Sequence, residues 1–368
     1  MNIILGTALL AASALTIDAL VRIPIEKRSS SSLKRRPWSL GAGNVTLTNN
    51  DEVFYSGEVC IGTPPQCFML DFDTGSSDLW VVSKYCNMGD PGCRVYLKNH
   101  LPTYDHKASS TYVKNGNPVF EQYGSGWYKG HESIDTFSIG GLRIEDQTFG
   151  EAIDLAVMGI QGLVGLAWRS LEVEDGVMPF SNIFKQYQLP HLFSFYLSSD
   201  LTGRGGEIII GGIDESLVDK DAIKYAPVLT RHGFWELSFT KATFGSNILD
   251  VDTAVMDTGT TDIYADFASF STILSAVKAY SNAQGNYVDC KTYKSLPDLT
   301  VQFGEIEMTI GPEDYISTTW TPGKCALTIL PGDSWIIGDI CLRKYYQVYD
   351  YANARFGAGP LKKSPRAS

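Results

Sequence analysis

The sequence predicts a mainly β protein with two related β-rich lobes and a cleft between them. Asp-Thr-Gly occurs twice, at 73–75 and 257–259, and each copy follows an apolar run typical of a buried strand. Glycine and aromatic residues are spread evenly along the 368 residues, which suits many short strands joined by tight turns. The repeated motif therefore places one turn in each lobe, and we expect the two turns to face each other.

The repeated turn carries a chemistry of its own. In both copies a small hydroxyl residue follows, Ser76 after Asp73 and Thr260 after Asp257. Two carboxyl groups a few ångströms apart do not both ionise easily, so such a pair keeps one proton. The ionised Asp can take a proton from a water that attacks a peptide carbonyl, while the protonated Asp donates to the carbonyl oxygen. This reaction requires neither a cofactor nor a metal. The alternative is two chance Asp-Gly turns at strand ends.

The charge and the hydrophobic content of the chain limit the kinds of partner that it can bind. The chain has 30 basic and 41 acidic side chains and a formal net charge of −11, which argues against nucleic acid because phosphate binding needs a cationic face. Its 44% hydrophobic content is enough to bury one or two substantial cores. An acidic protein is also compatible with work at low pH.

The first 36 residues look like processing segments. Residues 1–19 are apolar and end in small residues, which indicates a signal peptide; a short buried helix is the alternative. Residues 20–36 are basic and low in complexity and read as a short propeptide, which a cationic charge would hold over an acidic cleft until carboxylates protonate. A flexible linker cut after Arg36 is the other interpretation. Asn44 begins a glycosylation sequon, and no other stretch has the ~18 apolar residues of a membrane anchor.

Further motifs give the chain a family resemblance. The hairpin pattern over 55–72 leads into the first Asp, and Tyr123-Gly124-Ser125-Gly126 is typical of a flap that closes over bound peptide. The apolar pairs ending in Gly at 162–167 and 335–339 resemble strands that cross beneath catalytic turns. Together these motifs resemble the pepsin-like aspartic peptidases over residues 54–359, and within that family they most resemble the fungal secreted members.

The resemblance implies a pepsin-like aspartic protease fold and an aspartic-type endopeptidase made as a zymogen. It implies an N-terminal lobe over 45–222, a C-terminal lobe over 223–361 and a loose tail over 362–368. Residues 265–280 read as the longest helix, with Phe267 and Phe270 on a packed face.

The resemblance also assigns site residues. Asp73 and Asp257 are the expected catalytic pair. The two threonines should join the turns by mutual hydrogen bonds, the glycines should let backbone donors approach, and Trp80 should support the flap tyrosine. The expected supporting and substrate-binding residues are Asp71, Thr74, Gly75, Ser76, Trp80, Tyr123, Gly124, Ser125, Thr258, Gly259 and Thr260.

Substrates and location follow from the same resemblance. We expect a monomer that cleaves extended peptides between large hydrophobic residues, is inhibited by its own propeptide and is secreted, with a vacuolar or lysosomal location as the alternative. Asp71 stands where some fungal members also carry Asp, which favours tolerance of a basic side chain. Those members often place a further Asp on the flap, where this chain has Ser125.

The seven cysteines favour disulfides over metal in an exported protein. Cys60 and Cys67 flank the hairpin turn and could face each other across it. The pairings Cys86 with Cys93 and Cys290 with Cys325 are implied by the family resemblance, and Cys341 is left over.

Other chemistries fit less well. The chain has no His-Glu-x-x-His zinc motif, and His100 and His106 are expected in a solvated loop. It has no Gly-x-Ser-x-Gly elbow. Glycosidases also use paired carboxylates, but they do not explain two near-identical turns. A catalytically silent pepsin-fold binding or inhibitor protein remains the alternative, although both turns and the flap tyrosine are intact.

Overall fold

The computed structural model describes residues 21–29, 53–156, 160–174, 176–198 and 205–362. The signal peptide over 1–19, the sequon at Asn44 and residues 363–368 of the tail lie outside the described residues. Within the described part, no helix combines the length and apolar character needed to cross a membrane.

A large sheet of 13 strands forms the first half of the molecule and continues into strands from the end of the chain. Its spatial order is β11-β26-β25-β9-β10-β1-β2-β3-β8-β4-β7-β6-β5. In chain order the strands are β1 (Val21–Ser29), β2 (Val53–Ile61), β3 (Gln66–Asp73), β4 (Leu79–Val82), β5 (Val113–Tyr123), β6 (Gly126–Ile139), β7 (Leu142–Leu155), β8 (Gly162–Gly165), β9 (Leu192–Leu197), β10 (Gly206–Ile210), β11 (Lys224–Pro227), β25 (Tyr345–Asp350) and β26 (Arg355–Pro360).

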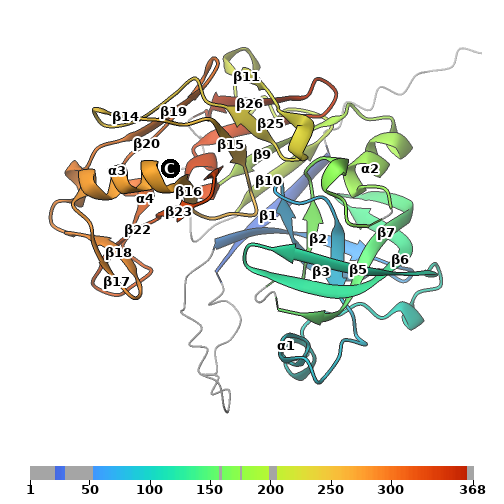
Figure 1. Ribbon diagram of the computed structural model, residues 1–368. Helices are drawn as coiled ribbons and strands as arrows, with labels where there is room; N and C mark the ends of the chain where they lie inside the picture. The colour runs from blue at the N-terminus through green and yellow to red at the C-terminus, as the bar shows by residue number, and fades with distance from the viewer. Residues whose placement is uncertain (1–20, 30–52, 157–159, 175, 199–204, 363–368) are drawn as a thin grey trace, which may run out of the picture.

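Three smaller sheets form the second half, which lies beside the first (Figure 1). A five-stranded sheet contains β12 (Glu236–Ser238), β15 (Thr253–Met256), β16 (Ile263–Asp266), β23 (Ile329–Gly332) and β24 (Trp335–Ile337). The two four-stranded sheets contain β13 (Lys241–Phe244), β14 (Asn247–Leu249), β19 (Leu299–Phe303) and β20 (Ile306–Ile310), and β17 (Tyr280–Asn282), β18 (Gly285–Val288), β21 (Ile316–Ser317) and β22 (Cys325–Leu327). The α-helices are α1 (Pro91–Lys98), α2 (Pro179–Tyr187), α3 (Phe267–Val277), α4 (Pro312–Tyr315) and α5 (Asp339–Leu342).

The two halves repeat one strand topology, which confirms the predicted mainly β fold with two related lobes. In the first lobe β3 runs parallel to β8, β8 is antiparallel to β4, and β4 is parallel to β7. In the second lobe β15, β24, β16 and β23 follow each other with the same three orientations. Each of the two sheets also has an antiparallel strand on the other side of its first strand: β2 beside β3 and β12 beside β15. The first lobe then adds β6 and β5 beyond β7, whereas β23 is the last strand of the second lobe's sheet among the described residues.

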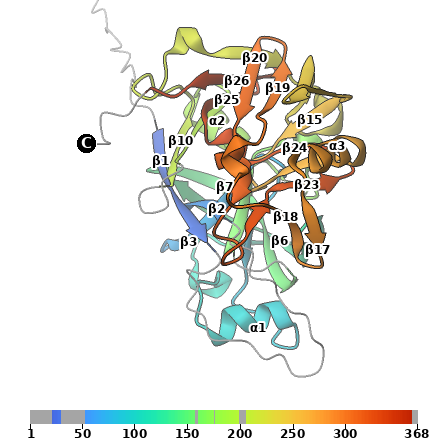
Figure 2. The same ribbon diagram turned by 90° about the vertical axis from the view of Figure 1, so that its left-hand side faces the viewer.

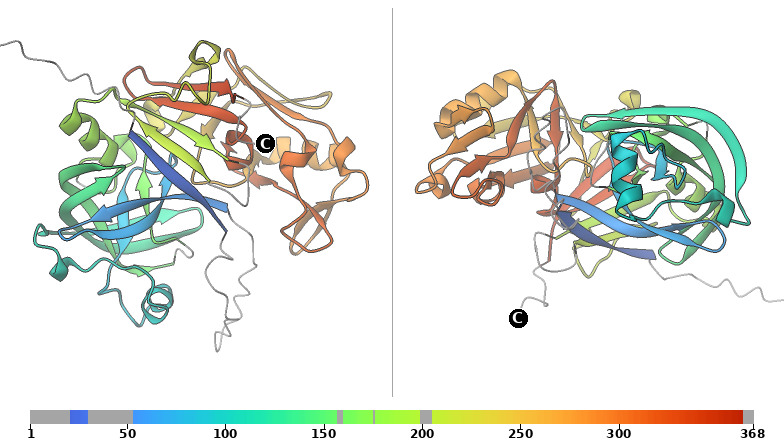
Figure 3. Two further views of the ribbon diagram at one scale, coloured as in Figure 1. Left: turned by 180° about the vertical axis from the view of Figure 1, so that it is seen from behind. Right: turned by 90° about the horizontal axis from the view of Figure 1, so that it is seen from below.

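Aromatic side chains join the lobes. Trp235, the first tryptophan of the second half, donates its indole N–H to the carbonyl of Leu166 at 2.8 Å. Phe193 of β9 stacks on Tyr349 of β25, with ring centroids 4.8 Å apart. β9 and β25 are also paired as antiparallel strands, so the sheet is continuous across the junction (Figure 3).

The segment expected to be a propeptide contributes a strand. β1 lies between β10 and β2 and pairs with both (Figure 2). Ile23 and Ile25 are buried in the main core, and the Arg22 guanidinium forms an ion pair with Asp214 at 2.9 Å. The described part of this segment therefore belongs to the sheet and does not lie across a cleft.

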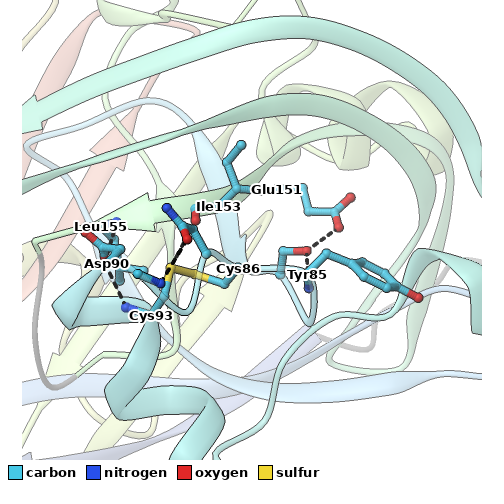
Figure 4. The surroundings of a disulfide bond; sticks show 10 residues. Tyr85, Cys86, Asp90, Cys93, Glu151, Ile153 and Leu155 are labelled. Atoms are coloured by element: carbon cyan, nitrogen blue, oxygen red, sulfur yellow. Dashed lines mark hydrogen bonds between the residues drawn. A yellow bond between two sulfur atoms is a disulfide. The ribbon is translucent and has the colours of Figure 1, made fainter.

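Three disulfides link Cys60 with Cys67, Cys86 with Cys93, and Cys290 with Cys325. Figure 4 shows the second of them at the start of α1, where the Asp90 carboxylate accepts a hydrogen bond from the Cys93 amide at 2.9 Å and caps the helix. Cys341 is free and buried in α5.

Helix α3 is shorter than the predicted 265–280. The Asp266 carboxylate caps it by accepting from the amides of Ala268 and Ser269, both at 3.0 Å. The packed face contains Phe270 as expected, but the assignment of Phe267 to it is wrong: its side chain is exposed in the first turn.

Candidate active site

The two Asp-Thr-Gly turns build the same local geometry. In the first turn the Asp73 carboxylate accepts from the Gly75 amide at 2.7 Å and from the Ser76 hydroxyl at 2.6 Å. In the second turn the Asp257 carboxylate accepts from the Gly259 amide at 2.8 Å and from the hydroxyl of Thr260 at 2.6 Å. Each carboxylate is therefore oriented by a backbone donor on one oxygen and by a hydroxyl on the other.

The threonines tie the turns together. The Thr74 hydroxyl donates to the Met256 carbonyl at 2.8 Å and accepts from the Thr258 amide at 3.0 Å. The Thr258 hydroxyl donates to the Phe72 carbonyl at 2.7 Å and accepts from the Thr74 amide at 3.1 Å. Both threonines are buried, so these four bonds fix each turn on the backbone of the other.

The glycines permit the close approach of the turns. A Cβ atom on Gly259 would lie 2.3 Å from Oδ1 of Asp73, and a Cβ on Gly75 would lie 2.7 Å from Oδ1 of Asp257. Each glycine thus faces the carboxylate of the opposite turn, and a side chain at either position would displace it.

The environment sets the proton affinity of the pair. Burial and the nearby charge of Asp257 raise the pKa of Asp73 well above its usual range, although the bonds from Ser76 and Gly75 act in the opposite direction. A hydrogen bond between the two carboxyl groups adds to the same effect. The pair therefore shares one proton in acid solution, so one carboxyl group is protonated and the other carboxylate is available as a base.

The predicted flap is the hairpin of β5 and β6, whose end pair is Tyr123 and Gly126. Gly124 and Ser125 are exposed at the tip, and a Cβ on Gly124 would meet nothing within 4 Å. Tyr123 packs against the hydrophobic cluster that contains Trp80. The Trp80 ring itself stacks on Tyr128, with centroids 4.8 Å apart, and Tyr123 packs against the same cluster.

Asp71 lies two residues before Asp73 on β3 and is 7% exposed. It accepts a hydrogen bond from the Ser56 hydroxyl of β2 at 2.7 Å. Val255 occupies the matching position of β15. The first lobe therefore has an acidic residue two positions before its catalytic Asp, where the second lobe has a valine, although the two turns are otherwise similar.

Two β lobes joined through facing Asp-Thr-Gly turns, with a flap on one lobe, define the class of aspartic peptidases. The chain belongs to the eukaryotic aspartyl protease family, which matches residues 54–361. It is similar to cathepsin D of Chionodraco hamatus, with 36% identity over 395 residues that cover 95% of this chain and 98% of the relative. Cathepsin D of Homo sapiens is 33% identical and covers 96% of both chains, and that of Dictyostelium discoideum is 33% identical with 97% of this chain and 98% of the relative covered. The protein is an aspartic endopeptidase that acts on peptide substrates.

Sequence reasoning missed several buried acidic residues of the first lobe. Glu121, Asp78 and Glu174 act on one another near the flap tyrosine, and Glu151 is a buried residue of β7. The signal for Glu121 was its place in a strand whose neighbours at alternate positions, Val119 and Tyr123, face inward. The expectation that His106 is solvated is wrong, because its ring bonds to Glu151 at 2.9 Å.

A metal site is weakly supported by the side chains. Among the described residues, Glu58, Cys60 and Cys67 bring three potential ligand atoms within 4.8 Å of one another. The two sulfur atoms form a disulfide, so neither is a thiolate that could bind a metal.

Proposed function

We propose that Asp73 and Asp257 together activate a water that attacks the peptide carbonyl of the substrate at acid pH. The ionised carboxylate removes a proton from the water, and the protonated one donates to the carbonyl oxygen. The observation that supports this proposal is the facing pair of turns, in which the pKa of Asp73 is raised by burial and by Asp257. Both carboxyls are held by matched donors and need no rearrangement before reaction.

The substrate is proposed to be an extended peptide with large hydrophobic residues around the scissile bond, bound by a monomeric enzyme. Closure of the flap places Tyr123 over the peptide and excludes water. Gly124 and Ser125 at the exposed tip bring little steric hindrance to this motion. Asp71, close to Asp73 on β3, gives the cleft a negative group that accommodates a basic side chain.

The chain is proposed to be made as a zymogen, with 1–19 as signal peptide, 20–36 as inhibitory propeptide, and lobes over 45–222 and 223–361. The position of β1 supports a structural role for the propeptide, because its removal empties the place between β2 and β10. Processing is therefore coupled to a rearrangement of this sheet. Any contact of the segment with the cleft would come from residues 30–36, which lie outside the described residues.

A signal peptide, a sequon at Asn44 and three disulfides support export of a glycoprotein through the secretory route. We place the mature enzyme outside the cell, and a vacuolar or lysosomal destination would use the same entry step. Fractionation of producing cells and medium, with detection of the mature chain in each, tells the two destinations apart.

The test of the mechanism is hydrolysis of denatured haemoglobin or casein between pH 2 and 7 by the acid-treated protein, with Asp73→Asn and Asp257→Asn in parallel. Peptide release at acid pH should fall by roughly 10³-fold or more in both variants, because each removes one half of the acid/base pair. Cleavage that survives in either variant would place the active site elsewhere. Circular dichroism of each variant shows that it is folded.

A further inference from the structure

Beneath the flap lies a group of buried acids that the proposed mechanism does not use. Along β5 the side chains of Val119 and Glu121 are buried and those of Phe120 and Gln122 are exposed. Glu121 therefore faces the body of the lobe on the same side as Tyr123, two residues before the flap tip. Its side chain is 7% exposed.

Asp78 and Glu174 complete this group, which we call the subflap acids together with Glu121. Asp78 accepts from the backbone amides of Val173 at 2.9 Å and Glu174 at 3.1 Å. Glu174 accepts from the Tyr128 hydroxyl at 3.3 Å. A Cβ on Gly150 would lie 2.6 Å from the Glu174 carboxyl, so the glycine leaves room for this acid.

The titratable groups that face the subflap acids are other acids and tyrosines. Asp78 and the Tyr123 hydroxyl act on Glu121, and Glu132 of β6 acts on Asp78 and Glu174. Tyr128 of β6 faces Glu174, and Asp73 of β3 acts on Tyr123. The basic side chain of Lys129 lies on the outer side of the hairpin, over the rings of Phe120 at 5.5 Å and Trp127 at 5.2 Å. No basic group thus compensates a charge on Glu121 among the described residues that act on it.

Glu151 of β7 shows how the same lobe stabilises a buried carboxylate that is ionised. It accepts from Ser83 at 2.6 Å and from Ser133 at 3.0 Å, while His106 lies at 2.9 Å and His131 at 3.4 Å (Figure 4 labels Glu151 near Tyr85). Burial alone would raise its pKa, but the bonds from His131, Ser83 and His106 outweigh this effect and lower it.

No histidine or serine acts on Glu121 among the described residues. Burial, with a smaller contribution from the charge of Asp78, raises the pKa of Glu121 to about 8. Its carboxyl is therefore uncharged in the acid range where the dyad works. Ionisation in place would bury a charge beside Asp78, which is costly without a partner.

The position of β5 offers a way to relieve that cost. Among the strands of the described residues, β5 is the outermost of the sheet at this end and pairs on one side only, with β6. The end of the hairpin can therefore lift and bring an ionised Glu121 to water, although Val119 and Tyr123 then lose contacts with the Trp80 cluster. The same motion carries Tyr123 away from the cleft.

We propose that Glu121 is a positioning residue for the flap, whose uncharged carboxyl keeps β5 seated with Tyr123 over the cleft and whose ionisation lifts the hairpin and weakens peptide binding. This inference rests on the proposed role of Tyr123 as the flap residue. It predicts a pH dependence of binding that is separate from the titration of the dyad.

The test compares the full processed enzyme with Glu121→Gln, which keeps the shape of the side chain and does not ionise. The probe is an uncleaved peptide in which a reduced CH₂–NH group replaces the scissile amide. Its Kd is measured for both proteins between pH 4.5 and 9. Titration of the dyad affects both proteins equally, so the ratio of wild-type Kd to variant Kd isolates Glu121.

Relative to its value at pH 4.5, this ratio should rise about twofold at pH 8 and about tenfold at pH 9. These values apply when only the protein with an uncharged Glu121 binds the peptide and that fraction falls with a single ionisation. The protection of residues 119–129 against hydrogen exchange, taken relative to the intrinsic exchange rate at each pH, should fall over the same range in the wild type and not in Glu121→Gln. The matched control is Gln122→Glu, which adds an acid to the exposed face of the same strand and should follow the wild type. Circular dichroism at each pH shows whether the proteins remain folded.

A ratio that stays constant from pH 4.5 to 9, with identical exchange of the flap amides, would overturn the inference. Should Glu121→Gln fail to fold, Glu121→Ile supplies the non-ionising comparison with the same expected ratio. Failure of the proposed function is a different result: the peptide would not bind at pH 4.5, or cleavage would survive in Asp73→Asn. The exchange measurement still tests the role of Glu121 in that case.

Discussion

The two catalytic turns share their sequence and differ in their surroundings. Both carboxylates accept from a glycine amide and a hydroxyl at distances that agree within 0.1 Å. Asp73 is 7% exposed and has a raised pKa, whereas Asp257 is only partly buried. The local peptide thus sets how each carboxylate is held, and the burial of Asp73 distinguishes its surroundings from those of Asp257.

Substitution of the two turn glycines should have the largest effect on activity and should differ between the two turns. Gly259→Ala should lower kcat/KM by at least about 10²-fold, because its Cβ would lie 2.3 Å from the Asp73 carboxylate and displace the reacting groups. Gly75→Ala, with 2.7 Å to the Asp257 carboxylate, should be less severe. Steady-state kinetics on one peptide measure both. Equal activity of the two variants would mean that the turns adjust independently of these distances.

The threonines test whether the turns act as one unit. Thr74→Val and Thr258→Val should each destabilise the protein by about 1–3 kcal/mol, because each leaves buried backbone groups of the opposite turn without a partner. The double variant should lose less than the sum, since both residues belong to one network. Chemical denaturation of the two single variants and the double variant measures the coupling. Strict additivity would contradict the shared network.

The residue two positions before each catalytic Asp differs between the lobes, and replacing it tests specificity apart from catalysis. Asp71→Val gives β3 the residue that β15 carries at Val255. Cleavage after Lys should fall by about tenfold relative to cleavage after Phe, because the change removes one negative group beside the cleft, and a partly desolvated charge pair contributes about 1.5 kcal/mol. Matched peptides that differ only in the residue before the scissile bond measure the ratio. Equal loss on both peptides would show that Asp71 supports the fold and does not read the substrate.

The sequence predicted the parts of the site that depend on local residue order. The two turns, the crossing strands and the flap follow from strand patterns joined to glycine turns, and the duplicated motif predicts the two lobes. Glu121 and Glu151 could not be predicted in the same way, because their opposite pKa shifts depend on burial and on Asp78, His106 and His131, which come from other elements. The burial of β1 between two distant strands was missed for the same reason: its partners lie at residues 53–61 and 206–210.

The smallest expected effect concerns β1, the strand between β10 and β2. Burial would raise the pKa of Asp214, but hydrogen bonds from Ser216 and Arg22 outweigh it and lower the pKa below its usual range. The ion pair therefore stabilises β1 above the ordinary Asp pKa of about 3.9 and is lost as the pH falls through the lower value of the folded protein. Because the Arg22 side chain is 48% exposed, its contribution should be at most about 1 kcal/mol. Arg22→Gln should thus speed release of the segment a few-fold at pH 6, with the difference vanishing toward pH 2, as followed by the rate of proteolytic cleavage within residues 20–36. A constant difference across this range would show that Arg22 acts through packing and not through its charge.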